Sequence, residues 1–526
     1  MKKFTLFIFS FVTLSVCAQN WDWARQATLT SAKQDSKKVI ADAFGNVFLL
    51  GTTQGYTEFG SSQVDSGTFI AKYTSNGTSL WAKNISASVS DFSLDAIGNV
   101  YLTGNFNGSI NISNTNLTSK GGTDFYFLKL DNNGNTILVN SFGGKGNDGA
   151  NAITSEPSGN SYLTGYFQDT ISLGSYTITD TVTWGIHFFM TKLTTNGNVT
   201  WADKGLSYCT SGELICVDKK NTIYVIAQYQ YPYAYGDGKV IIEYDTLGNT
   251  KYSKEACGTT TPIWGLTVDD SLNIYVISSW GSHYGDWPEI EKYNSLMQLK
   301  WSKHLGTGSD GYYLTNGLSV DSIGSIYVAG NLYRHSGAGN DSVFFANQWI
   351  HIKGDVEAVI AKLNSSGDYS WYKVFGGLGT ESPSDMCLDR NGQLYVTGNY
   401  HSSNSPPYET VVFGNDTLKN DGIWQQIFIA KLSSVNVTSG VQSLFEIISD
   451  VNIYPNPSSG IFTVRMDICQ AGAKITVRDV LGNCLLERSC RGETGQEINL
   501  SCQPRGIYFV ELLSGDEKVV KKVAVQ

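Results

Sequence analysis

The amino-acid sequence predicts an all-β fold that is built from repeated small sheets. Only 16% of the residues are charged, while 55 are glycine and 12% are aromatic, a composition typical of all-β proteins. The motif Asp-x-x-Gly-Asn-Val-Tyr-Leu-Thr-Gly at residues 95–104 recurs in degenerate form along the chain. A second motif, Phe-Ile-Ala-Lys-Tyr at residues 69–73, recurs with it after a variable gap. The aromatic residue of the first motif falls at Phe48, Tyr101, Tyr162, Tyr224, Tyr275, Tyr327 and Tyr395.

Each repeat unit is predicted to hold four short strands. One strand precedes the Asp of the first motif, the second carries the Tyr, the third carries the Lys of the second motif, and the fourth carries a Trp such as Trp81. Asp-x-x-Gly and Asn-Gly turns between apolar runs indicate hairpins. A unit of about 50 to 70 residues is too long for a solenoid repeat and suits the blade of a β-propeller. We therefore predict a seven-bladed β-propeller.

The two ends of the repeat region are predicted to meet in one blade. The seventh unit ends after Lys431 and Leu432 without a Trp strand, whereas residues 21–25, Trp-Asp-Trp-Ala-Arg, align with the Trp strand of the first unit. A ring closed in this way has no unpaired edge strand. We therefore expect the propeller to span residues 19–432, with the N-terminal strand completing the last blade.

The strand before each turn aspartate alternates between large and small residues. The position three residues before the Asp is large and apolar, and the position two before it is mostly small, including Cys216 and Cys387. Alternate residues of a strand point to opposite faces, so a large face can pack against the small face of the next blade. We therefore interpret these two cysteines as small buried residues rather than reactive thiols.

These motifs resemble the seven-bladed propeller repeat of bacterial secreted proteins, the SBBP type, whose blades carry similar Gly-Asn-Val-Tyr and Ala-Lys-Leu segments. The resemblance covers residues 21–432 and implies the fold, but it implies little about function. The fourth and fifth copies depart from the repeat, because Asn-Thr at residues 221–222 and Leu-Asn at residues 272–273 replace Gly-Asn. In the fourth copy Glu243 also replaces the Lys.

Residues 433–450 are interpreted as a linker and residues 451–526 as a separate small β-domain. This domain opens with Tyr-Pro-Asn-Pro, contains Gly-Ile-Tyr-Phe-Val at residues 506–510 and ends in a basic, valine-rich segment. It resembles the type-A C-terminal sorting domain of the type IX secretion system, a small immunoglobulin-like β-sandwich; an unrelated sandwich of that kind is the alternative. The resemblance implies recognition by the type IX machinery. Four cysteines allow three disulfide pairings here: Cys469, Cys484, Cys490 and Cys502.

Residues 1–18 are predicted to form a cleavable signal peptide. Two lysines precede a short apolar run, and small residues place the cleavage between Ala18 and Gln19. A lipoprotein acylated at Cys17 is the alternative. The apolar run is too short to span a membrane, and no transmembrane segment is predicted elsewhere. The net charge of −10, spread without blocks, argues against a nucleic-acid partner.

The sequence contains no recognisable catalytic or phosphate-binding motif, and its six histidines are scattered. Asp-Asn-Asn-Gly-Asn at residues 131–135 resembles the start of a calcium loop, but no Glu follows at the twelfth position, which favours a hairpin turn. The aspartates that open the first turns are assigned to folding, because turn carboxylates accept backbone hydrogen bonds. We therefore predict no catalytic residue, no metal site and no cofactor.

The long second hairpins and the crossings between blades are predicted to share the face that binds a ligand, since variable loops on a rigid scaffold carry function. In three neighbouring units these loops hold clustered aromatic residues, which bind sugars or protein partners when exposed. Packing within their own loops is the alternative. The predicted ligand residues are Tyr231, Tyr233, Trp280, Tyr284, Trp287 and Tyr333.

Three functions remain open from the sequence. A non-catalytic binding or adhesion protein for a glycan or protein, secreted or held at the outer-membrane surface of a Gram-negative bacterium after passage through the periplasm, is favoured because no catalytic group is recognisable. A carbohydrate-active enzyme, either a lyase or a glycosidase, would place two carboxylates opposite each other on the loop face. The third is a structural component of a surface assembly.

Overall fold

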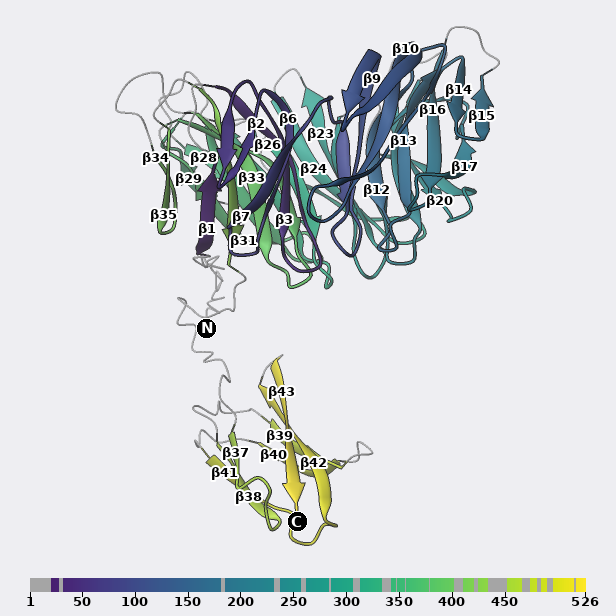
Figure 1. Cartoon of the computed structure of the whole chain (residues 1–526). Coiled ribbons are helices and arrows are strands. Elements are labelled where there is room, and N and C mark those ends of the chain that lie inside the picture. Colours follow the sequence, from purple (N-terminus) through teal and green to yellow (C-terminus); the bar gives the residue numbers. More distant parts are fainter. Residues whose placement is uncertain are drawn as a thin grey trace, which may run out of the picture. The chain divides into compact units, whose positions relative to one another are not determined.

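The computed structural model consists of strands, turns and loops, with no helix among the residues that it describes. The all-β prediction is therefore confirmed. The chain divides into two compact units, Met1–Val437 and Thr438–Gln526 (Figure 1). The described residues are 20–27, 32–180, 185–230, 237–256, 262–282, 285–305, 313–333, 342–346, 348–354, 356–377, 379–401, 410–420, 424–433, 452–465, 474–479, 484–489, 495–514 and 517–526.

The two sequence motifs form consecutive hairpins of one four-stranded sheet. The strand before the turn Asp comes first, and the strands with the Tyr or Phe, the Lys and the Trp follow in antiparallel order. The first sheet consists of β2 (Gln34–Ala41), β3 (Val47–Thr53), β6 (Gly67–Tyr73) and β7 (Ser79–Ile85).

The same order of strands is repeated in the sheets that follow along the chain. They are β8 (Asp91–Leu94), β9 (Val100–Ile112), β10 (Thr115–Leu130) and β11 (Thr136–Gly144); β12 (Gly149–Ser155), β13 (Ser161–Gln168), β16 (Ile186–Leu193) and β17 (Val199–Asp203); β18 (Cys209–Val217), β19 (Ile223–Gln230), β20 (Asp237–Tyr244) and β21 (Thr250–Ala256); β22 (Ile263–Val268), β23 (Ile274–Ser282), β24 (Gly285–Tyr293) and β25 (Leu299–His304); β26 (Tyr313–Val320), β27 (Ile326–Tyr333), β30 (Val356–Leu363) and β31 (Tyr369–Phe375).

The last sheet of this unit is built from both ends of the repeat region. Strands β32 (Thr380–Leu388), β33 (Leu394–His401) and β36 (Gln426–Leu432) pair in order. Strand β1 (Trp21–Gln26) then pairs antiparallel with β36 and supplies the fourth strand. A strand at the start of the chain therefore shares a sheet with one that lies about 400 residues later, a long-range contact that costs loop-closure entropy to form.

The first strands of successive sheets contact one another in chain order and then return to the start. Strand β2 contacts β8, and the contacts continue through β12, β18, β22, β26 and β32, which contacts β2 again. Figure 1 shows the sheets following one another in colour order from purple through teal to green. This cyclic arrangement of antiparallel sheets is a β-propeller, and the first strands lie at its inner edge.

Several second hairpins, which the sequence marked only as long variable loops, fold into extra two-stranded ribbons. Three of their aromatic residues are buried, since Phe59, Phe345 and Phe413 are each 1% exposed, whereas Tyr176 and Trp349 are 37% and 59% exposed. An aromatic residue in a long loop of this chain can therefore belong to the core. The ribbons are β4 (Thr57–Phe59) with β5 (Ser62–Val64), β14 (Thr170–Leu173) with β15 (Tyr176–Thr179), β28 (Ser342–Phe345) with β29 (Gln348–His351), and β34 (Thr410–Phe413) with β35 (Asp416–Lys419).

The Trp and Lys of one sheet bind the third-hairpin turn of the next. Trp81 Nε1 donates to the carbonyl oxygen of Asn132 at 3.1 Å, and Lys72 Nζ donates to the same oxygen at 3.2 Å. The Lys72 ammonium also lies 4.9 Å from the centroid of the Phe48 ring, a cation–π contact. Equivalent Trp or Lys donors reach the carbonyls of Ser75, Thr195, Thr246 and Ser365.

The second unit contains two small sheets that share one core. Buried Phe462 and Val464 of one sheet cluster with Ile475, Val477 and Val510 of the other. Cys484 and Cys502 are both free thiols, and each of the three disulfide pairings considered from the sequence needs both of them, so none of the three is formed in this structure. No helix among the described residues of either unit is long and apolar enough to span a membrane. The sheets are β37 (Asn452–Tyr454), β38 (Ile461–Arg465) and β41 (Gly495–Asn499), and β40 (Cys484–Ser489), β39 (Lys474–Arg478), β42 (Gly506–Ser514) and β43 (Glu517–Val525).

Candidate functional site

We call the side that carries the turns of the first and third hairpins the short-turn face. Most of its acidic groups are engaged in folding; the exception is Asp218, whose Oδ2 is buried and has no hydrogen-bond partner. In the first turn of the β8–β11 sheet, Asp95 Oδ1 accepts hydrogen bonds from the backbone N–H of Ile97 at 3.1 Å and of Asn99 at 2.9 Å. The hydroxyl of Tyr101 donates to the other oxygen of Asp95 at 3.0 Å. Gly98 adopts a φ of 79°, a left-handed conformation that glycine takes without strain. This turn chemistry, predicted from the sequence, leaves the carboxylate with no free acceptor for a ligand.

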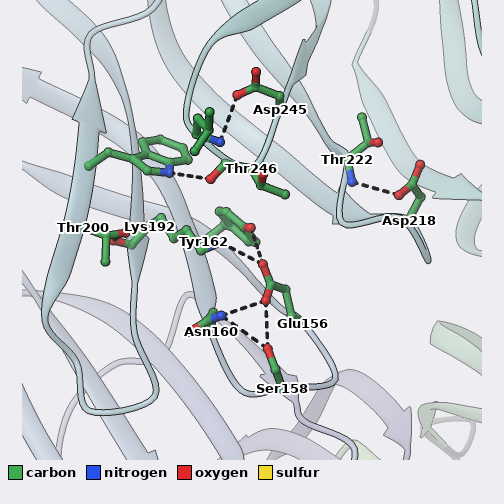
Figure 2. Close-up of polar contacts among 12 residues, drawn as sticks. Glu156, Ser158, Asn160, Tyr162, Lys192, Thr200, Asp218, Thr222, Asp245 and Thr246 are labelled. Carbon is green, nitrogen blue, oxygen red and sulfur yellow. Dashed lines mark hydrogen bonds and ion pairs between the residues drawn. The ribbon is translucent and has the colours of Figure 1, made fainter.

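Figure 2 shows the variant of this turn in which Glu156 replaces the Asp. The carboxylate accepts hydrogen bonds from Tyr162, from Asn160 at 2.8 Å and from the Lys192 ammonium at 2.9 Å. Burial alone would raise the pKa of Glu156, but these hydrogen bonds outweigh it and lower the pKa to about 2. A carboxylate that stays ionised and fully bonded in this way is a structural group and not a proton donor.

The same face also exposes isolated apolar side chains at the tips of its turns. Phe44, Ile97 and Ile323 are 68%, 63% and 79% exposed, and each stands two residues after the acid that opens its turn. Scattered exposed apolar residues are normal on protein surfaces. They nevertheless provide a matched set of substitutions for testing this face.

The inner edge of the propeller carries a β-bulge in most of its sheets. The register of the inner strand slips by one residue between Ser36 and Lys38 of β2, and comparable slips occur in β12, β18, β22, β26 and β32. A bulge re-aims the extra residue away from the ladder and is frequent next to binding sites. Each extra residue stands five positions before the acidic residue of the first turn. These residues are Lys37, Asn151, Glu213, Trp264, Asn316 and Ser384.

Two bulge residues present exposed side chains in the described part of the inner edge. Trp264 is 45% exposed, and Lys37 is also exposed. By contrast, the amide of Asn151 donates to Ser211 Oγ and to the Gly212 carbonyl, both at 2.9 Å. A half-exposed tryptophan at the inner edge is a stacking surface of the kind that binds a sugar ring or an apolar side chain.

Three charged residues meet at the inner edge where β32, β2 and β8 lie side by side. The Lys38 ammonium lies 2.6 Å from Asp91 Oδ1. The Asp385 carboxylate accepts the backbone N–H of Val39 at 2.9 Å, and the second Asp91 oxygen accepts that of Ile153 at 2.9 Å. We call Lys38, Asp91 and Asp385 the charged cluster. The equivalent positions of the other sheets hold only Ala152, Leu214, Gly265 and Gly317.

Burial of Asp385 between the inner strands raises the pKa of its carboxyl group to about 6, and the nearby Asp91 carboxylate acts in the same direction. The hydrogen bond from Val39 and the charge of Lys38 oppose this shift without cancelling it. A carboxyl group with a pKa near 6 beside a lysine and a second carboxylate can exchange a proton at physiological pH. The charged cluster is therefore a place in the described structure where acid–base chemistry can be tested.

We expect the Asp385→Asn variant to remove part of the pH dependence of stability. Because the pKa of Asp385 is higher in the folded state than in the unfolded state, its contribution to stability is complete below about pH 4 and is lost as the pH rises through about 6. The unfolding free energy of the wild type should fall by about 2 to 3 kcal/mol relative to the variant over that interval. Urea unfolding at a series of pH values measures the difference. Asp270→Asn is the control, because the Asp270 side chain is 58% exposed. If the unfolding free energies of the wild type and of Asp385→Asn changed in parallel with pH, the prediction would be wrong.

The structure does not test the predicted ligand residues, which stay a prediction. Tyr231, Tyr233 and Tyr284 lie outside the described residues, as do the signal-cleavage residues Ala18 and Gln19. The backbone positions of Trp280 in β23 and Trp287 in β24 pair directly across one hairpin. The hydroxyl of Tyr333, the last residue of β27, accepts a hydrogen bond from the Asn331 amide at 3.3 Å.

Sequence reasoning missed Trp264, Lys37 and the charged cluster. A bulge is a property of register between two strands, and the sequence motif does not display it. Their position in the repeat could have identified these residues, because each of them stands four or five residues before the acid of the first turn. The two cysteines at the inner strands are half-buried rather than fully buried. Their environment nevertheless raises the pKa of both the Cys216 and the Cys387 thiol, which disfavours the reactive thiolate.

Comparison with known proteins identifies one part of the chain. Residues 452–526 match the secretion system C-terminal sorting domain, which confirms the predicted sorting domain and implies recognition by the type IX secretion system. An uncharacterised WD repeat-containing protein of Acanthamoeba polyphaga mimivirus is 24% identical over 197 residues, which are 31% of this chain and 14% of that protein. An endo-acting ulvan lyase of Formosa agariphila is 29% identical over 105 residues, 20% of this chain and 19% of the lyase. The chain thus spans less than a fifth of each of these relatives.

Solved structures resemble the chain only distantly. The β-propeller domain of the Trilobed protease from Pyrococcus furiosus has 10% sequence identity and a TM-score of 0.41, over 76% of this chain and 96% of that one. PorZ, a surface component of the type IX secretion system of Porphyromonas gingivalis, has 10% identity and a TM-score of 0.25, over 96% of this chain and all of PorZ. Likenesses of this strength carry no information about activity.

Proposed function

We propose that this chain is a non-catalytic binding or adhesion protein that is exported by the type IX secretion system and holds a glycan or protein ligand on the long-loop face of its propeller. The observation that carries the proposal is the difference between the two faces. Turn groups such as Asp95 and Glu156 have every acceptor engaged in folding, whereas the second hairpins on the opposite face vary in length from sheet to sheet. Only the long-loop face, which carries the second hairpins, can vary between proteins without disturbing the propeller scaffold.

The proposed architecture is a seven-bladed propeller of the SBBP type over residues 19–432, a linker over residues 433–450 and an immunoglobulin-like sorting domain over residues 451–526. The cyclic contacts of the inner strands and the pairing of β1 with β36 support a closed ring. The shared core of the two C-terminal sheets supports a sandwich.

The proposed route begins with removal of residues 1–18 during export to the periplasm. The sorting domain then directs passage across the outer membrane of a Gram-negative bacterium. The mature propeller would be anchored at the cell surface or released. The match of residues 452–526 to the sorting domain supports this route.

A carbohydrate-active enzyme is the second candidate, and the charged cluster is the observation that favours it. A polysaccharide lyase or glycosidase needs a group that can take up a proton near neutral pH, and Asp385 has a pKa of about 6. The local similarity to an ulvan lyase makes ulvan a reasonable first substrate to test. Turnover by the wild type that is lost in Asp385→Asn would favour the enzyme; ligand binding without turnover, unchanged in Asp385→Asn, would favour the binding protein.

We expect replacement of both Trp280 and Trp287 by Ala to weaken ligand binding without unfolding the propeller. Their backbone positions face each other across the β23–β24 hairpin on the long-loop face, and aromatic side chains supply large contact area at low entropic cost. A glycan array and whole-cell adhesion measure the loss, which should be about tenfold or more for a pair of aromatic anchors. Equal melting temperatures would show that the fold is intact.

The matched control replaces the exposed apolar residues of the short-turn face, Phe44, Ile97 and Ile323, by Ser. Binding should survive these changes, because they lie on the face that we assign to folding. If this control lost binding while the double Trp variant kept it, the ligand would bind the short-turn face, and our proposal would be wrong.

A further inference from the structure

The boundary between the fourth sheet (β18–β21) and the fifth sheet (β22–β25) lacks the contact that holds most other neighbouring sheets together. We call this boundary the fourth seam. Elsewhere a Lys or Trp donates to a carbonyl of the next third-hairpin turn, as between the first and second sheets. In the fourth sheet Glu243 stands where the other six sheets have Lys, and Tyr252 stands where most have Trp. No donor in the described part of the chain reaches the equivalent carbonyl, that of Ser295.

The fourth sheet places a carboxylate at the position where the other sheets place an ammonium group. In the second sheet the Lys129 ammonium lies 5.0 Å from the centroid of the Tyr101 ring and donates to the Thr195 carbonyl at 2.9 Å. Glu243 pairs in register with Tyr224, as Lys129 pairs with Tyr101. The fourth seam therefore receives a negative charge where the repeat supplies a positive one.

A second carboxylate at this seam has also lost its partner. Asp218 opens the first turn of the fourth sheet, and its Oδ1 accepts the backbone N–H of Thr222 at 2.8 Å (Figure 2). In the second sheet the Asn99 amide donates to the other oxygen of Asp95 at 2.7 Å, but Thr222 has no amide to do so. Asp218 Oδ2 and Glu243 Oε2 are both buried and have no hydrogen-bond partner. Such buried, unsatisfied carboxylate oxygens are costly.

The ionisable groups of the fourth sheet compensate these carboxylates only in part. The Lys251 ammonium lies 3.8 Å from Glu243 Oε1, too far for a hydrogen bond, and its side chain is 44% exposed. Burial raises the pKa of Glu243; the charge of Lys251 opposes this shift, and that of Asp218 adds to it. Burial, Glu243 and Asp218 together raise the pKa of the Tyr224 phenol, so both carboxylates act on the same hydroxyl group.

The fifth sheet packs against these acids with apolar side chains. Met297 of its third-hairpin turn is 4% exposed and clusters with apolar residues of both sheets. The turn itself, residues 294–298, contains no ionisable side chain. The charged groups that the described structure places across this seam are Lys219, 3.8 Å from Asp270 with both side chains more than half exposed, and Lys254, 4.8 Å from the centroid of the Tyr293 ring. An exposed ion pair contributes little to stability.

We propose that the fourth seam is a pH-sensitive opening in the ring, closed while Glu243 holds a proton and loosened when Glu243 releases that proton to water. After ionisation two buried carboxylates lie beside Tyr224 without a full counter-charge, and separation of the two sheets hydrates them. Because the pKa of Glu243 is higher in the folded than in the unfolded state, its contribution to stability is complete below about pH 4.5 and is lost as the pH rises through the folded-state value. The seam should therefore close in acid and open toward alkaline pH.

Hydrogen exchange of the purified full chain, read by mass spectrometry, tests this device. Wild type and Glu243→Gln are compared at about pH 5 and at about pH 8, so that the chemical exchange rate cancels at each pH. At about pH 8 the amides of β20 and β21 should exchange about tenfold or more faster in the wild type, because Gln mimics the protonated acid. At about pH 5 the two proteins should exchange alike. The amides of β6 and β7, beside the seam held by Lys72 and Trp81, should not differ at either pH.

Two further variants sharpen the test. Glu243→Lys restores the ammonium group of the repeat beside Asp218, so β20 and β21 should stay protected at both pH values. Glu255→Gln is the matched control, because Glu255 is an exposed glutamate on β21 of the same sheet. This control should exchange like the wild type at both pH values. If Glu243→Lys fails to fold, the comparison with Glu243→Gln still decides the question.

The proposal is wrong if the wild type and Glu243→Gln exchange alike at β20 and β21 at both pH values. It is also wrong if Glu255→Gln protects these strands as Glu243→Gln does. If Ca²⁺ or Mg²⁺ restored protection of the wild type at alkaline pH and EDTA removed it, a metal ion rather than a proton would close the seam. Because the measurement is local to β20 and β21, ionisation of Asp385 does not contribute to it. The result is also independent of ligand binding at the long-loop face.

Discussion

Deletion of β1, Trp21–Gln26, is expected to lower the melting temperature of the propeller by roughly 10 °C or more. Trp21 and Trp23 are only 7% and 5% exposed. Trp21 packs edge-on against Phe375 and Phe413, with ring centroids 5.0 and 4.9 Å apart. Burial of two tryptophans contributes about 10 kcal/mol at about 25 cal/mol per Å², an upper estimate. Deletion would also leave the outer edge of β36 unpaired.

Differential scanning calorimetry of the propeller with and without residues 21–26 measures this effect. A synthetic peptide of the β1 sequence added in excess should restore part of the lost stability, because it can pair with β36 again. A scrambled peptide of the same composition is the control. A deletion variant that melts within about 2 °C of the wild type would show that ring closure does not depend on this strand.

Deletion of residues 451–526 is expected to stop export at the periplasm while leaving the propeller folded. The sorting domain matches residues 452–526, and its sheets build a core of their own that includes Val464, Ile475 and Val510. Its removal takes no strand from the propeller sheets. The truncated chain should therefore accumulate in the periplasm and disappear from the surface and the medium, as measured by cell fractionation and immunoblotting.

The control for this experiment separates sorting from folding. The propeller without residues 451–526, purified from the periplasm, should melt at the temperature of the propeller in the full chain. The sorting domain fused to an unrelated periplasmic protein should direct that protein to the surface. Normal surface levels of the truncated chain would show that the C-terminal domain is not the export signal.

The sequence was most informative where local chemistry repeats. The Asp-x-x-Gly turns form as predicted, because a carboxylate such as that of Asp95 needs only backbone donors two and four residues away. The order of strands in each sheet also follows from neighbouring hairpins. The sequence predicted less about the candidate site than about the fold. Of the predicted ligand residues, the described structure brings together only the backbone of Trp280 and Trp287, and it buries other loop aromatics such as Phe413.

The sequence by itself determined the all-β class, the succession of hairpins in each sheet and the sorting domain. Each of these depends on residues that are close together in the chain. Only the tertiary structure decided which groups meet across sheets. Lys38 meets Asp91 over 53 residues, and Lys219 meets Asp270 across the fourth seam. Trp264 is exposed because a register slip re-aims it. Register and the packing of one sheet on the next are set by the summed contacts of the whole ring, and no local motif records them.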